Sequence, residues 1–83
     1  MTELTTKERE LVAIGAAIGS NCVPCIEYHI SEAKKAGLSD TQIVVAIQIA
    51  DTVKKVPAQK VIQAALGLLE KNGNNKLSRM GLK

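Results

Sequence analysis

Hydrophobic residues recur at helical spacing along most of the chain. The first apolar set runs from Leu11 to Ile18 and follows Thr5 and Glu8, which are spaced as a capping box. This pattern predicts a helix over about 6–19. The stretch 19–21, Gly-Ser-Asn, then interrupts the pattern and predicts the end of that helix.

A second helix is predicted directly after this break. Ser20 or Asn21 supplies its N-cap, so that it begins at Asn21 or Cys22. Its end is marked by two lysines followed by Gly37.

The start signals of a third helix lie in the segment LSDTQIV. Ser39 is placed as N-cap with Gln42 at the third helical position, and Leu38 and Ile43 are spaced to form a hydrophobic staple. The apolar pattern predicts that this helix continues to about Lys55.

A fourth helix is predicted to begin at Pro57, because proline is tolerated in a first helical turn, and to end at Gly73. No segment alternates with a two-residue period between hairpin turns, so we expect an all-α fold of about four helices. The predicted organisation is one helical domain at 1–73 and a basic C-terminal tail at 74–83.

The predicted third helix is apolar around most of its circumference, since residues 43–50 read IVVAIQIA. A helix of this kind needs burial on several sides, which a small four-helix domain cannot easily provide. We therefore expect a homo-oligomer that buries the third and fourth helices between subunits; an unusually apolar monomer core is the alternative.

Composition limits the classes of function. The chain has 83 residues and a net charge of +3, but its lysines are dispersed and Tyr28 is its one aromatic residue. Nucleic-acid binding needs a concentrated basic stripe or stacking aromatics, so we expect no nucleic-acid partner.

The polar N-terminus lacks the apolar core of a secretory signal, and no apolar run approaches the length of about 18 residues of a membrane span. We expect a cytoplasmic protein with no membrane partner.

Both cysteines and the single histidine fall within ten residues, as Cys22-x-x-Cys25-x-x-x-His29. On a helix these spacings place all three side chains on one face, with both thiols at the helix N-terminus. The helix dipole and the unpaired N–H groups there lower the pKa of a thiol and so favour the nucleophilic thiolate. Cys25 is then expected to attack, His29 to transfer protons, and Cys22 to resolve the intermediate as a disulfide.

Two other functions fit the same residues. Cys22, Cys25, His29 and possibly Glu10 could bind zinc or iron, although structural sites usually take a second ligand pair from a distant segment. Alternatively, the chain is a non-catalytic helical assembly module in which the cysteines have no chemical role. The redox interpretation is preferred and requires neither a metal nor another cofactor.

The cysteine segment resembles the AhpD-like, or carboxymuconolactone decarboxylase, family of small all-helical proteins. The signature of its redox-active members is a glutamate twelve residues before C-x-x-C-x-x-x-H, and Glu10 stands at that position before Cys22. The resemblance covers about residues 5–72. It implies that Cys25 attacks, that Cys22 donates a proton and closes the disulfide, and that His29 and Glu10 form a proton relay. From the residues alone, Glu10 is equally well explained as a solvated first-turn carboxylate.

The resemblance also implies substrates and partners. These are a hydroperoxide or a disulfide as oxidant, and a thiol or a lipoyl or thioredoxin-like protein as reductant, with assembly into trimers or hexamers. Full-length relatives often have a histidine at the position of Pro24, so we expect a shorter relay, weak peroxide turnover and a preference for dithiol exchange. Decarboxylase members lack the cysteine pair, so its presence argues against lactone decarboxylation.

Overall fold

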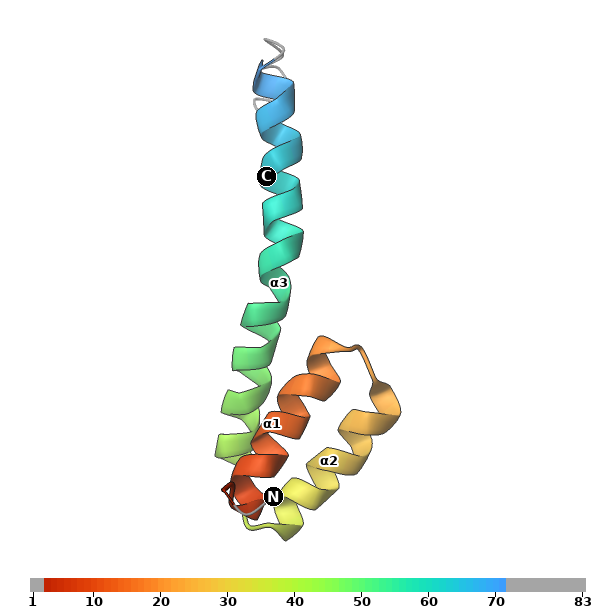
Figure 1. Ribbon diagram of the computed structural model, residues 1–83, viewed down its shortest axis with the longest axis vertical. Helices are drawn as coiled ribbons and strands as arrows, with labels where there is room; N and C mark the ends of the chain where they lie inside the picture. The colour runs from red at the N-terminus through yellow and green to blue at the C-terminus, as the bar shows by residue number, and fades with distance from the viewer. Residues whose placement is uncertain (1–2, 72–83) are drawn as a thin grey trace.

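The computed structural model describes residues 3–71, and these residues form three α-helices and no strand (Figure 1). Helix α1 spans Thr6–Gly19, α2 spans Val23–Lys35 and α3 spans Asp40–Lys71. The predicted all-α class is confirmed. The tail assigned to 74–83 and the predicted helix end at Gly73 lie outside the described residues.

Capping boxes begin α1 and α3, as the sequence predicts. The Glu8 N–H donates to Thr5 Oγ1 at 3.1 Å, and the Thr5 N–H donates to Glu8 Oε1 at 2.8 Å. Ser39 and Gln42 form the same reciprocal pair at 3.1 and 2.9 Å. Each box satisfies two N–H groups that have no partner within the helix, and this fixes the residue at which the helix begins.

The predicted third and fourth helices are one continuous helix, α3, with Pro57 in its interior. The expected break at Pro57 is therefore absent, and the described residues hold three helices instead of four. Proline removes one backbone donor and crowds the preceding turn, at a cost of about 3 kcal/mol inside a helix. Residues 53–56, Val-Lys-Lys-Val, offer neither a glycine nor a capping side chain that would end the helix before it.

Helix α1 lies between the other two helices and packs against both of them (Figure 1). The buried cluster at this junction consists of Ile14 from α1, Ala33 from α2, Ile43 from α3 and Leu38 from the connecting segment. Leu38 and Ile43 are the two residues that the sequence pairs as a hydrophobic staple. This small core holds α1 and α2 in the register that places Glu10 opposite His29.

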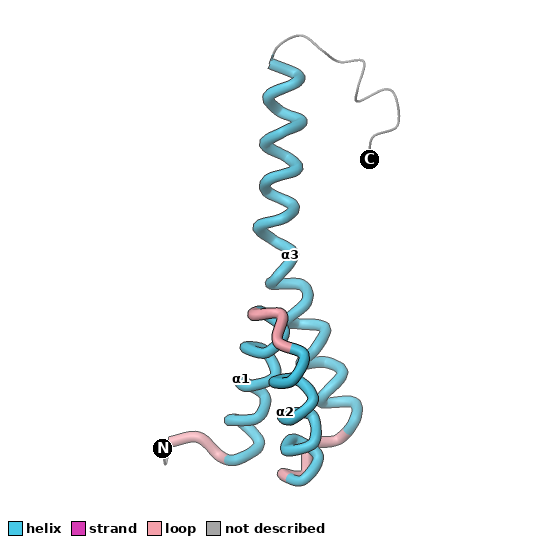
Figure 2. Tube along the Cα trace, turned by 90° about the vertical axis from the view of Figure 1, so that its right-hand side faces the viewer, coloured by secondary structure: helices cyan, strands magenta, loops and turns pink. Residues whose placement is uncertain are grey.

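The C-terminal half of α3 extends well beyond α1 and α2, which makes the molecule elongated at 56 × 24 × 20 Å (Figure 2). Large apolar side chains remain exposed along this helix: Val44, Val45, Ile49, Val53, Val56, Val61, Ile62 and Leu68. No helix within residues 3–71 combines the length and the apolar composition needed to cross a membrane.

Candidate functional site

The turn between α1 and α2 fixes the position of the first cysteine. Asn21 adopts a left-handed backbone with a φ of 57°, which asparagine tolerates better than most residues. The Asn21 N–H donates to the Ile18 carbonyl at 3.2 Å, and the Cys22 N–H donates to the Ala17 carbonyl at 3.0 Å. Together these bonds form a Schellman motif after the C-cap Ser20, and they tie the Cys22 backbone to the end of α1.

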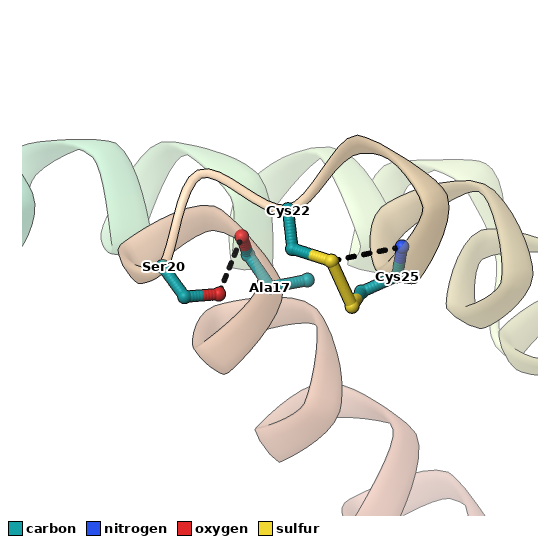
Figure 3. Close-up of a disulfide and its surroundings, with 4 residues drawn as sticks. All are labelled: Ala17, Ser20, Cys22 and Cys25. Atoms are coloured by element: carbon teal, nitrogen blue, oxygen red, sulfur yellow. Dashed lines mark hydrogen bonds between the residues drawn. A yellow bond between two sulfur atoms is a disulfide. The ribbon is translucent and has the colours of Figure 1, made fainter.

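Cys22 is also the N-cap of α2. Its Sγ accepts a hydrogen bond from the Cys25 N–H at 3.3 Å (Figure 3), while Pro24 occupies the first turn, as predicted. The prediction that Ser20 or Asn21 caps this helix is wrong, because both residues are used to close α1. The consequence is that a sulfur atom occupies the position where a capping oxygen usually receives helix N–H groups.

The two cysteines are joined by a disulfide, with an S–S distance of 2.08 Å and a Cα–Cα distance of 5.2 Å. Cys25 is exposed, whereas Cys22 is half-buried against the turn. As whole residues, Cys25 is therefore more open to solvent than Cys22.

Glu10 of α1 and His29 of α2 form a direct contact. The His29 Nδ1–H donates to Glu10 Oε1 at 2.8 Å, and the two side chains are only 29% and 16% exposed, respectively. Glu10 is thus not a solvated first-turn carboxylate, which was one of the two explanations that its sequence position allowed. Packing α1 against α2 brings together residues that are 19 positions apart.

The Glu10 contact orients the His29 ring. Because a carboxylate can only accept hydrogen bonds, Nδ1 carries the proton, and a neutral ring then has its lone pair at Nε2. His29 stands one helical turn after Cys25 along α2. Within residues 3–71, and in this disulfide form, no hydrogen bond joins His29 to either sulfur.

The geometry also bears on the metal-binding alternative. Within the described part of the chain, no three histidine, cysteine or carboxylate side chains are grouped so that they could hold a metal ion. The sulfurs of Cys22 and Cys25 are bonded to each other, and Glu10 is directed at His29. No ligand set for zinc or iron is therefore assembled in this form.

Lys54 is the residue near the cysteines that sequence reasoning missed. It comes from α3, and its Nζ donates a hydrogen bond to Asn21 Oδ1 across 33 positions of sequence. Lys54 and Cys22 line the same pocket. Nothing in the sequence sets this lysine apart from its neighbour Lys55, because only the packing of α3 on α1 brings it to the turn.

Comparison with known families tests the resemblance seen in the sequence. The profile of the carboxymuconolactone decarboxylase family matches residues 2–71, which is most of the chain. The chain belongs to this family. Comparison with curated proteins and with solved structures finds no significant match. Within the carboxymuconolactone decarboxylase family, this chain carries the CxxC pair at the N-terminus of α2.

Proposed function

We propose that the protein is a thiol-dependent oxidoreductase in which Cys22 and Cys25 alternate between dithiol and disulfide. Membership of the carboxymuconolactone decarboxylase family and the disulfide at the start of α2 support this proposal. The observation that carries it is the 2.8 Å bond between Glu10 and His29, one helical turn from Cys25. A carboxylate, an oriented imidazole and a thiol in series are what a proton relay to a cysteine nucleophile requires.

The proposed oxidation proceeds in two steps when a hydroperoxide is the oxidant. His29 Nε2 takes the Cys25 proton, the thiolate attacks the terminal peroxide oxygen, and the O–O bond breaks to leave a sulfenic acid and an alcohol. The alcohol oxygen receives its proton from His29. Cys22 then attacks the Cys25 sulfur, which forms the disulfide and releases water.

A disulfide substrate uses the same residues. The Cys25 thiolate attacks one sulfur of the substrate to give a mixed disulfide and one free thiol, and Cys22 then displaces the second. We favour this reaction as the main activity, because Pro24 provides no relay group beside Cys25. In either case an external dithiol, or two thiols, returns the protein to its reduced form. We assign this cycle to the cytoplasm, where a lone cysteine pair is more often catalytic than structural.

The test measures intact mass and free thiols of the reduced protein before and after one equivalent of hydroperoxide or of a disulfide substrate. Wild type should lose two hydrogen atoms and both thiols. Cys22→Ser should retain one oxygen atom, or one substrate adduct, on Cys25. Cys25→Ser is the matched variant that should remain unreacted.

The outcomes separate the possible activities. Oxidation of wild type by the disulfide substrate but not by peroxide would make the protein a disulfide reductase. If adducts form on Cys22 in the Cys25→Ser variant at the wild-type rate, the assignment of Cys25 as nucleophile is wrong. If neither oxidant reacts with wild type, the redox function is wrong.

We further infer that the chain acts as a homo-oligomer, as a trimer or hexamer. An apolar groove of about 480 Å³ runs between α1 and α3 and is lined in part by Leu11, Val45 and Ile49. The projecting half of α3 carries a second exposed apolar set, including Val61 and Ile62. Two exposed apolar surfaces on so small a domain are typical of subunits that associate.

A further inference from the structure

A pocket of about 290 Å³ adjoins the disulfide on the side of Cys22. Its walls come from the end of α1, the turn, the start of α2 and the middle of α3. The side chains of Ala17, Ile18 and Ile26 make it largely apolar. Among the described residues that line it, Lys54 is the one with a charged side chain.

The Lys54 ammonium is held at this pocket. Lys54 donates a hydrogen bond to Asn21 Oδ1. Asn21 directly precedes Cys22, and the backbone N–H groups of both residues are fixed by the Schellman motif. The neighbouring Lys55 forms an ordinary surface ion pair with Asp51 at 2.9 Å. Lys54, by contrast, is exposed, lines the pocket and forms no ion pair with a carboxylate of residues 3–71.

The Cys22 sulfur is placed to become an anion. As N-cap of α2 it already accepts the Cys25 N–H at 3.3 Å, a bond that strengthens when the sulfur is charged. Cys25 is the more exposed of the two cysteines. This exposure favours attack of an external thiolate on Cys25, with Cys22 as the leaving sulfur.

We propose that Lys54 stabilises the Cys22 thiolate released when a thiol reductant opens the disulfide at Cys25. This inference rests on the proposed redox function and concerns the reducing half of the cycle. The reductant thiolate attacks Cys25 Sγ, a mixed disulfide forms, and the Cys22–Cys25 bond breaks with its electron pair on Cys22 Sγ. A second reductant thiol then displaces Cys25, which takes one proton. Two electrons thus pass from two thiols to the protein, Cys22 remains a thiolate beside Lys54, and the second proton goes to solvent.

The role of Lys54 follows from charge. The disulfide is neutral and gains nothing from a neighbouring ammonium, whereas a thiolate is stabilised by it. Stabilising the reduced form makes the disulfide more oxidising, and a better leaving thiolate speeds its opening. Lys54 thus acts as a positioning and electrostatic residue that touches neither oxidant nor reductant.

The experiment compares Lys54→Gln with Lys54→Arg, which retains the charge. Lys60→Gln is the matched control, because Lys60 is exposed on the same helix about 9 Å further along its axis. Each protein is equilibrated with glutathione or dithiothreitol at defined ratios of reduced to oxidised form, and its fraction of disulfide is measured. Lys54→Gln should lower the equilibrium constant for reduction about tenfold, equivalent to about 30 mV. Lys54→Arg and Lys60→Gln should stay near wild type.

A second measurement isolates the thiolate. In a Cys25→Ser background, the pH dependence of Cys22 alkylation gives the pKa of that thiol, and Lys54→Gln should raise it while Lys60→Gln should not. If Lys54→Gln gives the same equilibrium constant and the same Cys22 pKa as Lys60→Gln, the inference is wrong. Circular dichroism establishes that each variant is folded. These readouts need no turnover. A shift in the pKa of Cys22, with no oxidation of wild type by peroxide or by a disulfide, would overturn the proposed function alone. Oxidation of wild type without either shift in Lys54→Gln would overturn this inference alone.

Discussion

The contact between Glu10 and His29 decides which role can be assigned to Glu10. Glu10 lies in the first half of α1, and in the sequence it is one carboxylate among several. In the structure it is mostly buried and accepts a bond from His29, whose second ring nitrogen is left for a proton acceptor or donor. Burial of a carboxylate is unfavourable unless it is paired, so the hydrogen bond from His29 explains how Glu10 can be mostly buried.

The proposed proton relay can be tested by variants of Glu10 and His29. His29→Gln should slow oxidation of Cys25 by about 10²-fold, because general acid–base catalysis typically contributes at least that much. Glu10→Gln keeps an acceptor for the Nδ1–H but removes the charge, so it should slow the reaction less. Stopped-flow thiol oxidation measures both rates. Glu27→Gln, an exposed carboxylate on α2, is the control that should leave the rate unchanged. Equal rates for all of these variants would remove Glu10 and His29 from the mechanism.

Asn21 lies in the turn that joins α1 to α2. Its left-handed backbone lets one three-residue turn end α1 and begin α2, so Cys22 belongs to both helix ends. Other residues with a Cβ pay about 1–2 kcal/mol in that conformation, while asparagine and glycine adopt it more easily. Asparagine also supplies the oxygen that Lys54 binds, which glycine could not do.

At the scale of elements, the unexpected feature is the continuity of α3 through Pro57. An interior proline leaves one helical acceptor without its backbone donor and is unfavourable by about 3 kcal/mol. The helix is long enough that residues on both sides of Pro57 retain their own hydrogen bonds. The proline therefore weakens one turn without dividing the element.

The continuity of α3 can be tested by Pro57→Ala. The variant regains one helical hydrogen bond and loses the clash, so the free energy of unfolding should rise by about 1–3 kcal/mol. Urea unfolding followed by far-ultraviolet circular dichroism provides the measurement, with Ala58→Gly as an opposite control that should lower stability. If Pro57 instead begins a separate helix, Pro57→Ala will leave stability unchanged.

At the scale of the whole molecule, the core is too small for the apolar surface that the chain carries. Within residues 3–71, five apolar residues are buried, Ile14, Ala17, Ala33, Leu38 and Ile43, while α3 exposes eight large ones. Domains of this size bury only about 60% of the surface of their unfolded chain, and association with a partner is one way to bury more. In the proposed homo-oligomer, a second copy of this chain would cover the groove and the exposed apolar face of α3.

Association is tested by light scattering or sedimentation of the full chain. Wild type should have a mass that is a multiple of the 8.8 kDa protomer, and Ile62→Glu should shift it toward the monomer. A buried charge without a partner at an interface is strongly unfavourable, which is the reason for the expected dissociation. Gln63→Glu adds the same charge at a neighbouring exposed position and should have a much smaller effect. A monomeric wild type would contradict the oligomer.

The sequence by itself determined the all-α class, the capping boxes at Thr5 and Ser39, the placement of Pro24 in a first turn, and membership of the carboxymuconolactone decarboxylase family. These features depend on residues at most a few positions apart, or on spacings within one helix, so local patterns suffice to predict them. The same patterns failed at Cys22, whose capping role depends on how the preceding helix ends, and at Pro57, where a proline can open one helix or lie inside another. Only the tertiary structure decided that Glu10 meets His29 and that Lys54 reaches the turn before Cys22, because side chains 19 and 33 positions apart come together only when α1 packs between α2 and α3.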